Sequence, residues 1–219
     1  MDQIQDYLKR DHKAISSAED MSGVQDFFEE MNYSHFPVAD HTSYIGNLNA
    51  EDALTFDASK LVSDYHYVLE SFFAKTTMTW FEVLEIATKN HANVVPVLDD
   101  QNAYIGYYEL DDILLFFQET PLIKDPGHVL VVQKGIQDYS LGQIAQIVES
   151  NNGKLLGVFV SATVGSKIEI TLKLALGPLN ETIQTFRRYN YEIVSQHQDD
   201  QYMTNLKERS DYLDKYLNL

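Results

Sequence analysis

The chain of 219 residues contains no cysteine. Disulfide bonds, thiolate nucleophiles and cysteine metal sites are therefore excluded. No apolar run approaches the roughly 18 residues that a membrane helix needs, so we expect no membrane partner. The first residues, 1–6, are acidic and lack the basic and apolar segments of a secretory signal. We therefore expect a cytoplasmic protein.

Basic residues are scarce. The chain has 16 lysines and arginines against 33 acidic residues, which gives a formal net charge of −17. A surface of this charge repels phosphate backbones and anionic lipids, so we expect no nucleic-acid partner. It does not exclude a small anionic ligand, because a few backbone N–H groups and one or two cationic side chains can hold a phosphate locally.

Catalytic motifs are also missing. The seven histidines form no His-x-His or His-Glu-x-x-His pattern, and the chain has no P-loop, Gly-x-Gly-x-x-Gly or Gly-x-Ser-x-Gly. Adjacent acids such as Asp111 and Asp112 point in different directions on a helix or a strand, so spacing alone does not make them a catalytic pair. We expect no enzyme activity and no metal site.

What the sequence does contain is a repeat. Pro37-Val38-Ala39-Asp40, Tyr44-Ile45-Gly46 and Glu51-Asp52-Ala53-Leu54 return as Pro96-Val97-Leu98-Asp99, Tyr104-Ile105-Gly106 and Asp111-Asp112-Ile113-Leu114. The prolines are 59 residues apart and the glycines 60, so the second copy has one extra residue, which we place in a hairpin loop. A repeat of this length indicates a duplicated structural unit. Two such units are expected to face each other across a cleft.

Each copy predicts a helix, a strand, a return strand and a second helix. The first helix runs near residues 21–31, with Ser16 and Ser17 before it as cap candidates, and the second starts at Asn49. In the second copy, Thr79 caps the first helix, and residues 109–118 form the second. Residues 1–10 form a short helix or strap. Residues 65–73 are β-prone and are predicted to join the second copy.

After Pro121 and Pro126-Gly127 the pattern changes, which marks a domain boundary. The remainder predicts the order β-α-β-β-α-β of a ferredoxin-like unit. Its strands lie near residues 128–133, 154–164, 168–174 and 191–195, with helices near 141–151 and 179–189. Residues 199–219 carry a helical apolar stripe and predict a terminal helix.

The repeated sequence motifs resemble those of a tandem pair of cystathionine-β-synthase (CBS) domains, and residues 128–197 resemble an ACT domain. The layout is similar to the CBS–CBS–ACT proteins of the acetoin-utilisation type. The resemblance implies an α+β fold with CBS repeats at 1–60 and 61–122, an ACT-like domain at 128–197 and a C-terminal helix at 199–219. It also implies a homodimer with a regulatory role.

CBS pairs of this kind commonly bind adenine nucleotides between the repeats, which is the only cofactor-like molecule that we expect. The resemblance implies sugar contacts from Asp52 and Asp112, the latter with a Glu109 that adds negative charge. Asn49 replaces the usual hydroxyl residue of the first copy. Base-pocket and neighbouring positions are His35, Phe36, Tyr44, Val94, Val95 and Tyr104. For His35 a surface or strand-edge position is the alternative, and for Tyr44 and Tyr104 core packing is.

Three functions stay open at this point. The first is a regulator that senses a small ligand, with an adenine nucleotide favoured, and signals through a dimer. The second is an acidic oligomerising adaptor for an unknown partner protein, in which Asp52 and Asp112 only support helix starts. The third is an amino-acid sensor that works through residues 128–197, although Asp138-Tyr139 stands where an ACT domain usually has Pro-Gly.

Overall fold

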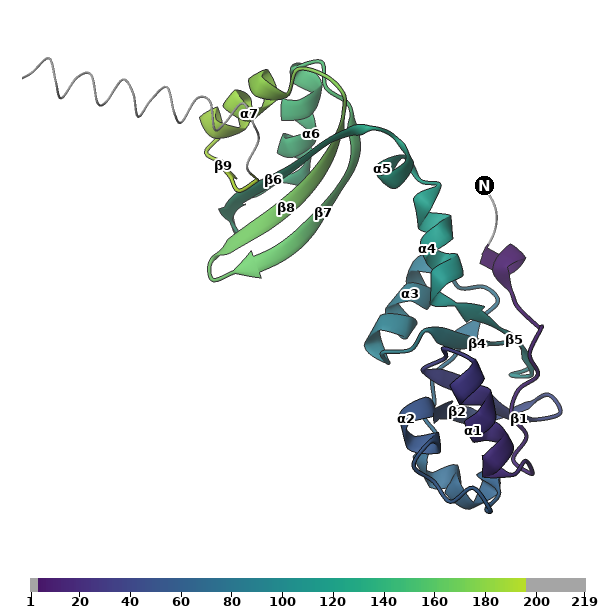
Figure 1. Ribbon diagram of the computed structural model, residues 1–219. Helices are drawn as coiled ribbons and strands as arrows, with labels where there is room; N and C mark the ends of the chain where they lie inside the picture. Colours follow the sequence, from purple (N-terminus) through teal and green to yellow (C-terminus); the bar gives the residue numbers. More distant parts are fainter. Residues whose placement is uncertain (1–3, 196–219) are drawn as a thin grey trace, which may run out of the picture. The chain divides into compact units, whose positions relative to one another are not determined.

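The computed structural model describes residues 4–195 and shows a mixed α+β fold (Figure 1). The chain divides into two units, residues 1–118 and 119–219. The C-terminal helix expected at 199–219 lies outside the described residues. Among residues 4–195, no helix combines the length and apolar character needed to cross a membrane.

The first unit contains both copies of the repeat. The first copy has the elements η1 (Ile4–Tyr7), α1 (Met21–Glu30), β1 (His35–Asp40), β2 (Ser43–Asn49) and α2 (Ala50–Ala53). The second has η2 (Val62–Val68), β3 (Ala74–Lys75), α3 (Trp80–Lys89), β4 (Val94–Leu98), β5 (Tyr104–Glu109) and α4 (Leu110–Gln118).

The two copies match in register as well as in element order. Val38 lies opposite Gly46 in the β1–β2 hairpin, and Val97 lies opposite Gly106 in the β4–β5 hairpin. Both hairpins have an irregularity directly after these pairs. The extra residue of the second copy lies in its longer hairpin loop, as the sequence predicts. The two hairpins of the first unit therefore share the same register and the same irregularity.

The helix starts follow local cap chemistry. The Asn49 side chain accepts a hydrogen bond from the backbone N–H of Glu51, and Thr79 forms a capping box with Glu82. The expectation that Ser16 and Ser17 cap α1 is wrong, because both serines bind the carboxylate of Asp40 instead.

The segments that precede the copies are exchanged between them. We name residues 8–11 the first strap and residues 69–72 the second strap. Lys9 exchanges two backbone hydrogen bonds with Tyr107 of β5, at 2.9 and 3.1 Å. Glu70 does the same with Asn47 of β2, at 2.7 and 2.9 Å. Each strap therefore pairs with the return strand of the other copy.

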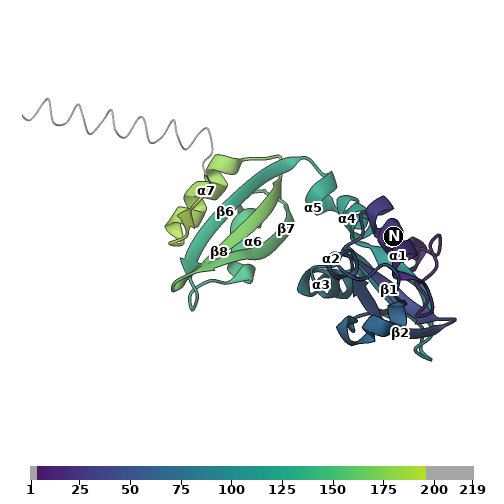
Figure 2. The ribbon, with the colours of Figure 1, turned by 60° about the horizontal axis from the view of Figure 1, so that its bottom comes forward.

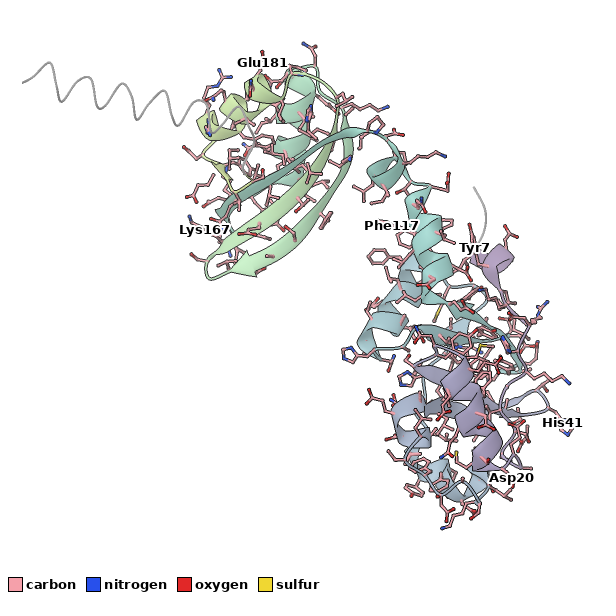
Figure 3. All side chains as sticks on the ribbon, in the orientation of Figure 1. Tyr7, Asp20, His41, Phe117, Lys167 and Glu181 are labelled. Carbon is pink, nitrogen blue, oxygen red and sulfur yellow. The ribbon has the colours of Figure 1, made fainter. Side chains whose placement is uncertain are left out.

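This exchange corrects the prediction for residues 65–73. Residues 62–68 form the 3-10 helix η2 rather than a strand, and Tyr65 is buried on the first copy's core, stacked on Phe56 at 4.0 Å. The second strap then joins β2 of the first copy. Aromatic and β-branched residues favour strands and buried 3-10 turns alike, so composition did not separate the two. At the other end, Tyr7 of η1 lies beside α4 (Figure 3). Its ring meets that of Phe116 edge to face.

The second unit is a four-stranded sheet with two helices on one face (Figures 1 and 2). The strands lie in the order β7-β8-β6-β9, and along β8 buried side chains alternate with partly buried ones. The elements are α5 (Pro121–Lys124), β6 (Gly127–Gly135), α6 (Leu141–Ser150), β7 (Leu155–Val164), β8 (Lys167–Ala175), α7 (Leu179–Arg188) and β9 (Glu192–Ile193). That this unit is an ACT-like domain stays a prediction.

Candidate functional site

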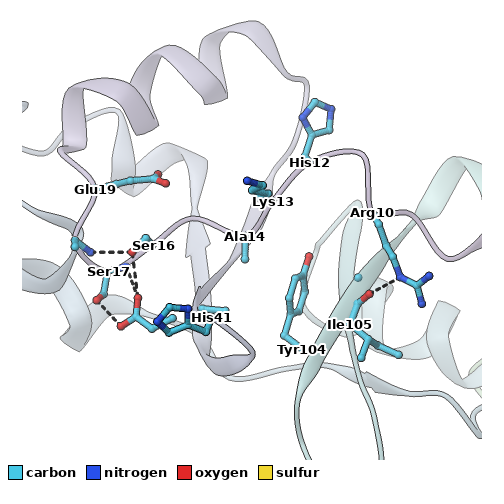
Figure 4. Close-up of a pocket in the computed structure, with 14 residues that line it drawn as sticks. Arg10, His12, Lys13, Ala14, Ser16, Ser17, Glu19, His41, Tyr104 and Ile105 are labelled. Carbon is cyan, nitrogen blue, oxygen red and sulfur yellow. Dashed lines mark hydrogen bonds between the residues drawn. The ribbon is translucent and has the colours of Figure 1, made fainter.

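A hollow of about 730 Å³ lies where the two copies meet (Figure 4). The tips of the two hairpins touch here, since the backbone N–H of Tyr104 donates to the carbonyl of Thr42 at 2.7 Å. One wall comes from the chain that runs from the first strap toward α1, and the other from the start of β5. The lining residues are Arg10, His12, Lys13, Ala14, Ser16, Ser17, Ala18, Glu19, Ala39, Asp40, His41, Tyr104, Ile105 and Gly106.

Cationic groups gather at this hollow although the chain as a whole is strongly acidic. Arg10 is fixed by one hydrogen bond, from its Nε to the carbonyl of Ile105 at 2.8 Å, which leaves its outer nitrogens toward solvent. Lys13 is exposed and has no ion pair among the described residues. The imidazoles of His12 and His41 also line the hollow. The arrangement suits an anion.

Two carboxylates, Glu19 and Asp40, also line the hollow, and Asp40 is already satisfied. Asp40 accepts hydrogen bonds from the hydroxyl of Ser17 at 2.6 Å, from its backbone N–H at 3.0 Å and from the hydroxyl of Ser16 at 3.2 Å. The Ser17 hydroxyl, followed by the Ser17 N–H, holds the pKa of Asp40 below its usual range. Asp40 therefore stays ionised and acts as a brace for the wall.

The Tyr104 side chain lines the same hollow. Its hydroxyl oxygen is enclosed and has no hydrogen-bond partner within residues 4–195. Burial raises the pKa of Tyr104, so its hydroxyl remains protonated. An enclosed hydroxyl without a partner is costly unless something binds it. Among the nine site residues that the resemblance implied, Tyr104 is the one that lines the hollow.

The first copy's implied residues lie together at another place. His35 is buried, and its Nε2 lies 3.2 Å from Nδ2 of Asn49 and 3.4 Å from a carboxylate oxygen of Glu70. His35 is therefore not a surface residue, although it does stand at the start of β1. Asp52 is exposed one turn further along α2. The second strap thus places the Glu70 carboxylate beside His35, at the position where the resemblance implied a nucleotide.

The second copy's implied residue Asp112 is engaged within the chain. Lys9 Nζ lies 3.0 Å from its Oδ2 and 2.9 Å from Oε2 of Glu109. Burial lowers the pKa of Lys9, but the hydrogen bonds and charges of the two carboxylates outweigh this and raise it. The ammonium is therefore fixed as a cation between them.

The other implied residues serve packing. Phe36 is buried and stacked on Tyr33, with ring centroids 5.3 Å apart. Val94 and Val95 belong to the two cores of the first unit. Tyr44 donates its hydroxyl to the carbonyl of Phe72 at 2.9 Å. For these four, the structure favours the core role, and a role in ligand binding stays a prediction.

The sequence analysis did not predict Arg10 and Lys13 as site residues, although both line the hollow. Lys9-Arg10-Asp11-His12-Lys13 is the densest basic run in an acidic chain, and this local charge contrast was the available signal. Within the described residues, no three histidine or acidic side chains group closely enough to hold a metal ion.

Comparison with known proteins supports part of this picture. Residues 62–119 match the sequence model of the CBS domain, so the second copy carries a CBS domain. The first copy has the same order of elements. The ACT-like domain and the acetoin-utilisation layout stay predictions. A comparison with curated proteins found no match.

Several solved structures are similar to this chain over about half of its length. A CBS domain pair/ACT domain protein from Thermotoga maritima is 19% identical, with a TM-score of 0.48, over 53% of this chain and 97% of its own. The CBS domains of a transcriptional regulator from Streptococcus pneumoniae are 16% identical, with a TM-score of 0.45, over 52% of this chain and 97% of their own. The cytosolic domain of the Mg²⁺ channel MgtE, in complex with ATP, is 18% identical, with a TM-score of 0.45, over 52% of this chain and 48% of its own.

Proposed function

We propose that the chain is a non-enzymatic regulatory protein that binds a small anionic ligand in the hollow between its two copies, with an adenine nucleotide as the first candidate. One observation carries the proposal. In a chain with a net charge of −17, Arg10 and Lys13 line one recess of about 730 Å³ together with Glu19 and Asp40, and Asp40 is already held by Ser16 and Ser17. The volume is in the range of sites that hold small molecules.

The lining suits a nucleotide better than a bare phosphate. Arg10 and Lys13 can meet phosphate oxygens, while Tyr104 offers an enclosed hydroxyl and a ring. The CBS match of the second copy favours the same ligand class, because the repeated words resemble units that bind adenine nucleotides. Homodimerisation and signalling through residues 128–197 belong to this proposal.

Regulation requires that the ligand prefers one arrangement of the copies. The hollow is bordered by both copies, and the contact between Thr42 and Tyr104 joins their hairpin tips. A ligand that contacts both Arg10 and Tyr104 would bind the first strap and the second copy's hairpin at the same time. The relative placement of the hairpin tips is therefore the quantity that binding would change.

Calorimetry with AMP, ADP, ATP and S-adenosylmethionine tests the proposal. We expect heat and a thermal shift with a phosphorylated member of the set, and weaker binding in Lys13→Ala. Lys89→Ala is the matched control, since Lys89 is also exposed but lies at the end of α3, outside the hollow. No binding at millimolar concentrations, or equal losses in both variants, would remove the proposal.

An adaptor without a small ligand is a second candidate, and one observation favours it. Asn49 and Asp112, two of the implied contact residues, are occupied by helix capping and by Lys9. Asn49→Ala should then lower the free energy of unfolding by about 1 kcal/mol, as loss of a cap does, and leave any ligand affinity unchanged. A pull-down that recovers the same partner with and without nucleotide would support the adaptor.

A further inference from the structure

We infer that the first strap is a latch that closes the second copy's implied ligand site with the ammonium of Lys9, while the hollow lined by Arg10 and Lys13 stays open. The inference rests on the proposed function for its biological meaning. Its structural content stands on contacts of the strap alone.

The backbone brings Lys9 into place. Its N–H and carbonyl both bond to Tyr107 of β5, and the strap crosses directly over Gly106. A side chain at Gly106 would put a Cβ 2.3 Å from the Lys9 carbonyl oxygen, so only glycine admits the strap here. The next two residues also bind β5. Arg10 donates from its Nε to the Ile105 carbonyl, and Asp11 accepts a hydrogen bond from the Tyr107 hydroxyl.

The side chain then fills the site. The helix start that would offer Asp112 to a sugar instead offers it to Lys9 Nζ at 3.0 Å, with Glu109 at 2.9 Å. Glu109 is held in position by the Tyr33 hydroxyl, which donates to its Oε1 at 2.7 Å. The side chains of Glu109 and Asp112 are 20% and 18% exposed, so the three charges are partly withdrawn from water. A nucleotide would have to displace the ammonium and then face two carboxylates.

The first copy shows that this closure is particular to the second. There the equivalent strap residue is Glu70, which also pairs with the return strand but presents a carboxylate to His35 at 3.4 Å. The Glu70 side chain is 41% exposed and has no cation of lysine or arginine beside it in the described residues. Two straps with the same backbone role therefore carry opposite charges, and only the first strap forms a double ion pair.

The latch can open because its hold is local. Besides the Lys9 ion pairs, the strap has one bridge of two backbone hydrogen bonds and the side-chain bonds of Arg10 and Asp11, both of which are exposed residues. Segments held by few buried contacts open by local fluctuations without global unfolding. The ammonium of Lys9 sets how often this happens.

Hydrogen exchange of the full chain tests the latch without any nucleotide. In Lys9→Met, which keeps the length of the side chain and removes its charge, we expect the amides of residues 9 and 107 to exchange about fivefold faster, as loss of the two ion pairs implies. Lys13→Met is the control, since Lys13 is close along the chain and has no ion pair in the described part. Exchange in that variant should equal wild type.

Two further measurements keep the test decisive. Lys9→Arg retains the cation and should restore slow exchange at residues 9 and 107. In Lys9→Ala, millimolar n-butylammonium should slow those amides again, and it should leave Lys13→Ala unaffected. Equal exchange in wild type and Lys9→Met, or no effect of charge in this series, would overturn the latch. A failure of nucleotide binding alone would overturn the proposed function and leave the latch in place.

Discussion

Ser34 and Asn93 occupy equivalent positions of the two copies and hydrogen-bond to each other. The Ser34 N–H donates to Oδ1 of Asn93 at 2.8 Å, and the Asn93 N–H donates to Oγ of Ser34 at 3.0 Å. Each residue directly precedes the first strand of its hairpin. The pair therefore joins equivalent positions of the two copies. It also gives a hydrogen-bond acceptor to the backbone N–H that precedes each strand.

Asn93→Ala should destabilise the first unit. The substitution removes the acceptor for the Ser34 N–H and the bond from Asn93 Nδ2 to the carbonyl of Asn32. Partly buried backbone groups left without partners cost about 1–3 kcal/mol. Chemical unfolding of Asn93→Ala, Ser34→Ala and the double variant would give the coupling, which should exceed about 0.5 kcal/mol for residues in contact. Strict additivity would contradict the pairing.

The glycines of the repeated Tyr-Ile-Gly words should tolerate alanine poorly, and Gly106 least of all. A Cβ on Gly106 would lie 2.3 Å from the Lys9 carbonyl, and its φ of 149° disfavours a side chain. At Gly46 the nearest atom is Cβ of Leu69 at 2.8 Å. We expect Gly106→Ala to cost about 1–3 kcal/mol and Gly46→Ala less.

Gly23→Ala is the control for this series. Gly23 lies inside α1, and a Cβ added to it would meet nothing within 4 Å, so alanine should stabilise the helix by about 0.5–1 kcal/mol. Thermal unfolding of the three variants would rank them. A Gly106→Ala protein as stable as Gly23→Ala would show that the strap does not lie over β5.

The glycines also show how far the sequence could lead. The repeat predicted the doubling, the hairpins and the site of the inserted residue, because periodic local patterns determine these. It could not show why Gly46 and Gly106 recur. The reason is the crossing of a strap from the other copy, and a contact between Lys9 and Tyr107 leaves no local mark on either segment.

The candidate site was harder to predict for the same reason. Asp112 has the type and spacing of a sugar contact, but its role depends on Lys9, which lies some hundred residues earlier in the chain. Ser16 and Ser17 are typical helix caps by sequence. In the fold they turn to Asp40, since the hairpin tip brings that carboxylate within 2.6 Å of the Ser17 hydroxyl.

The Asp40 brace predicts a pH dependence at the hollow. The pKa of Asp40 is lowered in the fold, chiefly by the Ser17 hydroxyl, so its contribution to stability is present above the pKa of an unfolded aspartate, near 4. That contribution is lost as the pH falls through the lower, folded pKa. Ser17→Ala should move the pKa of Asp40 up toward the ordinary value, which carboxyl carbon NMR would measure. An unchanged titration would contradict the hydrogen bond.

The tyrosines of the repeated words give a matched pair for the ligand site. The Tyr44 hydroxyl donates to the Phe72 carbonyl at 2.9 Å, whereas the Tyr104 hydroxyl is enclosed without a partner in the described chain. Tyr44→Phe should therefore lower the free energy of unfolding by about 0.5–1.5 kcal/mol, the usual worth of a hydrogen bond. Tyr104→Phe should leave the free protein equally stable or slightly more so, because it deletes an unsatisfied group.

Ligand binding should reverse this order. If the hollow holds the anionic ligand, Tyr104→Phe loses a contact that exists only in the complex, so its affinity should fall while its stability does not. Tyr44→Phe should keep its affinity, since Tyr44 does not line the hollow. Thermal unfolding without ligand and calorimetry with it separate the two effects. Equal affinity of wild type and Tyr104→Phe would show that the enclosed hydroxyl does not face the ligand, and the site would then have to be moved toward Arg10 and Lys13.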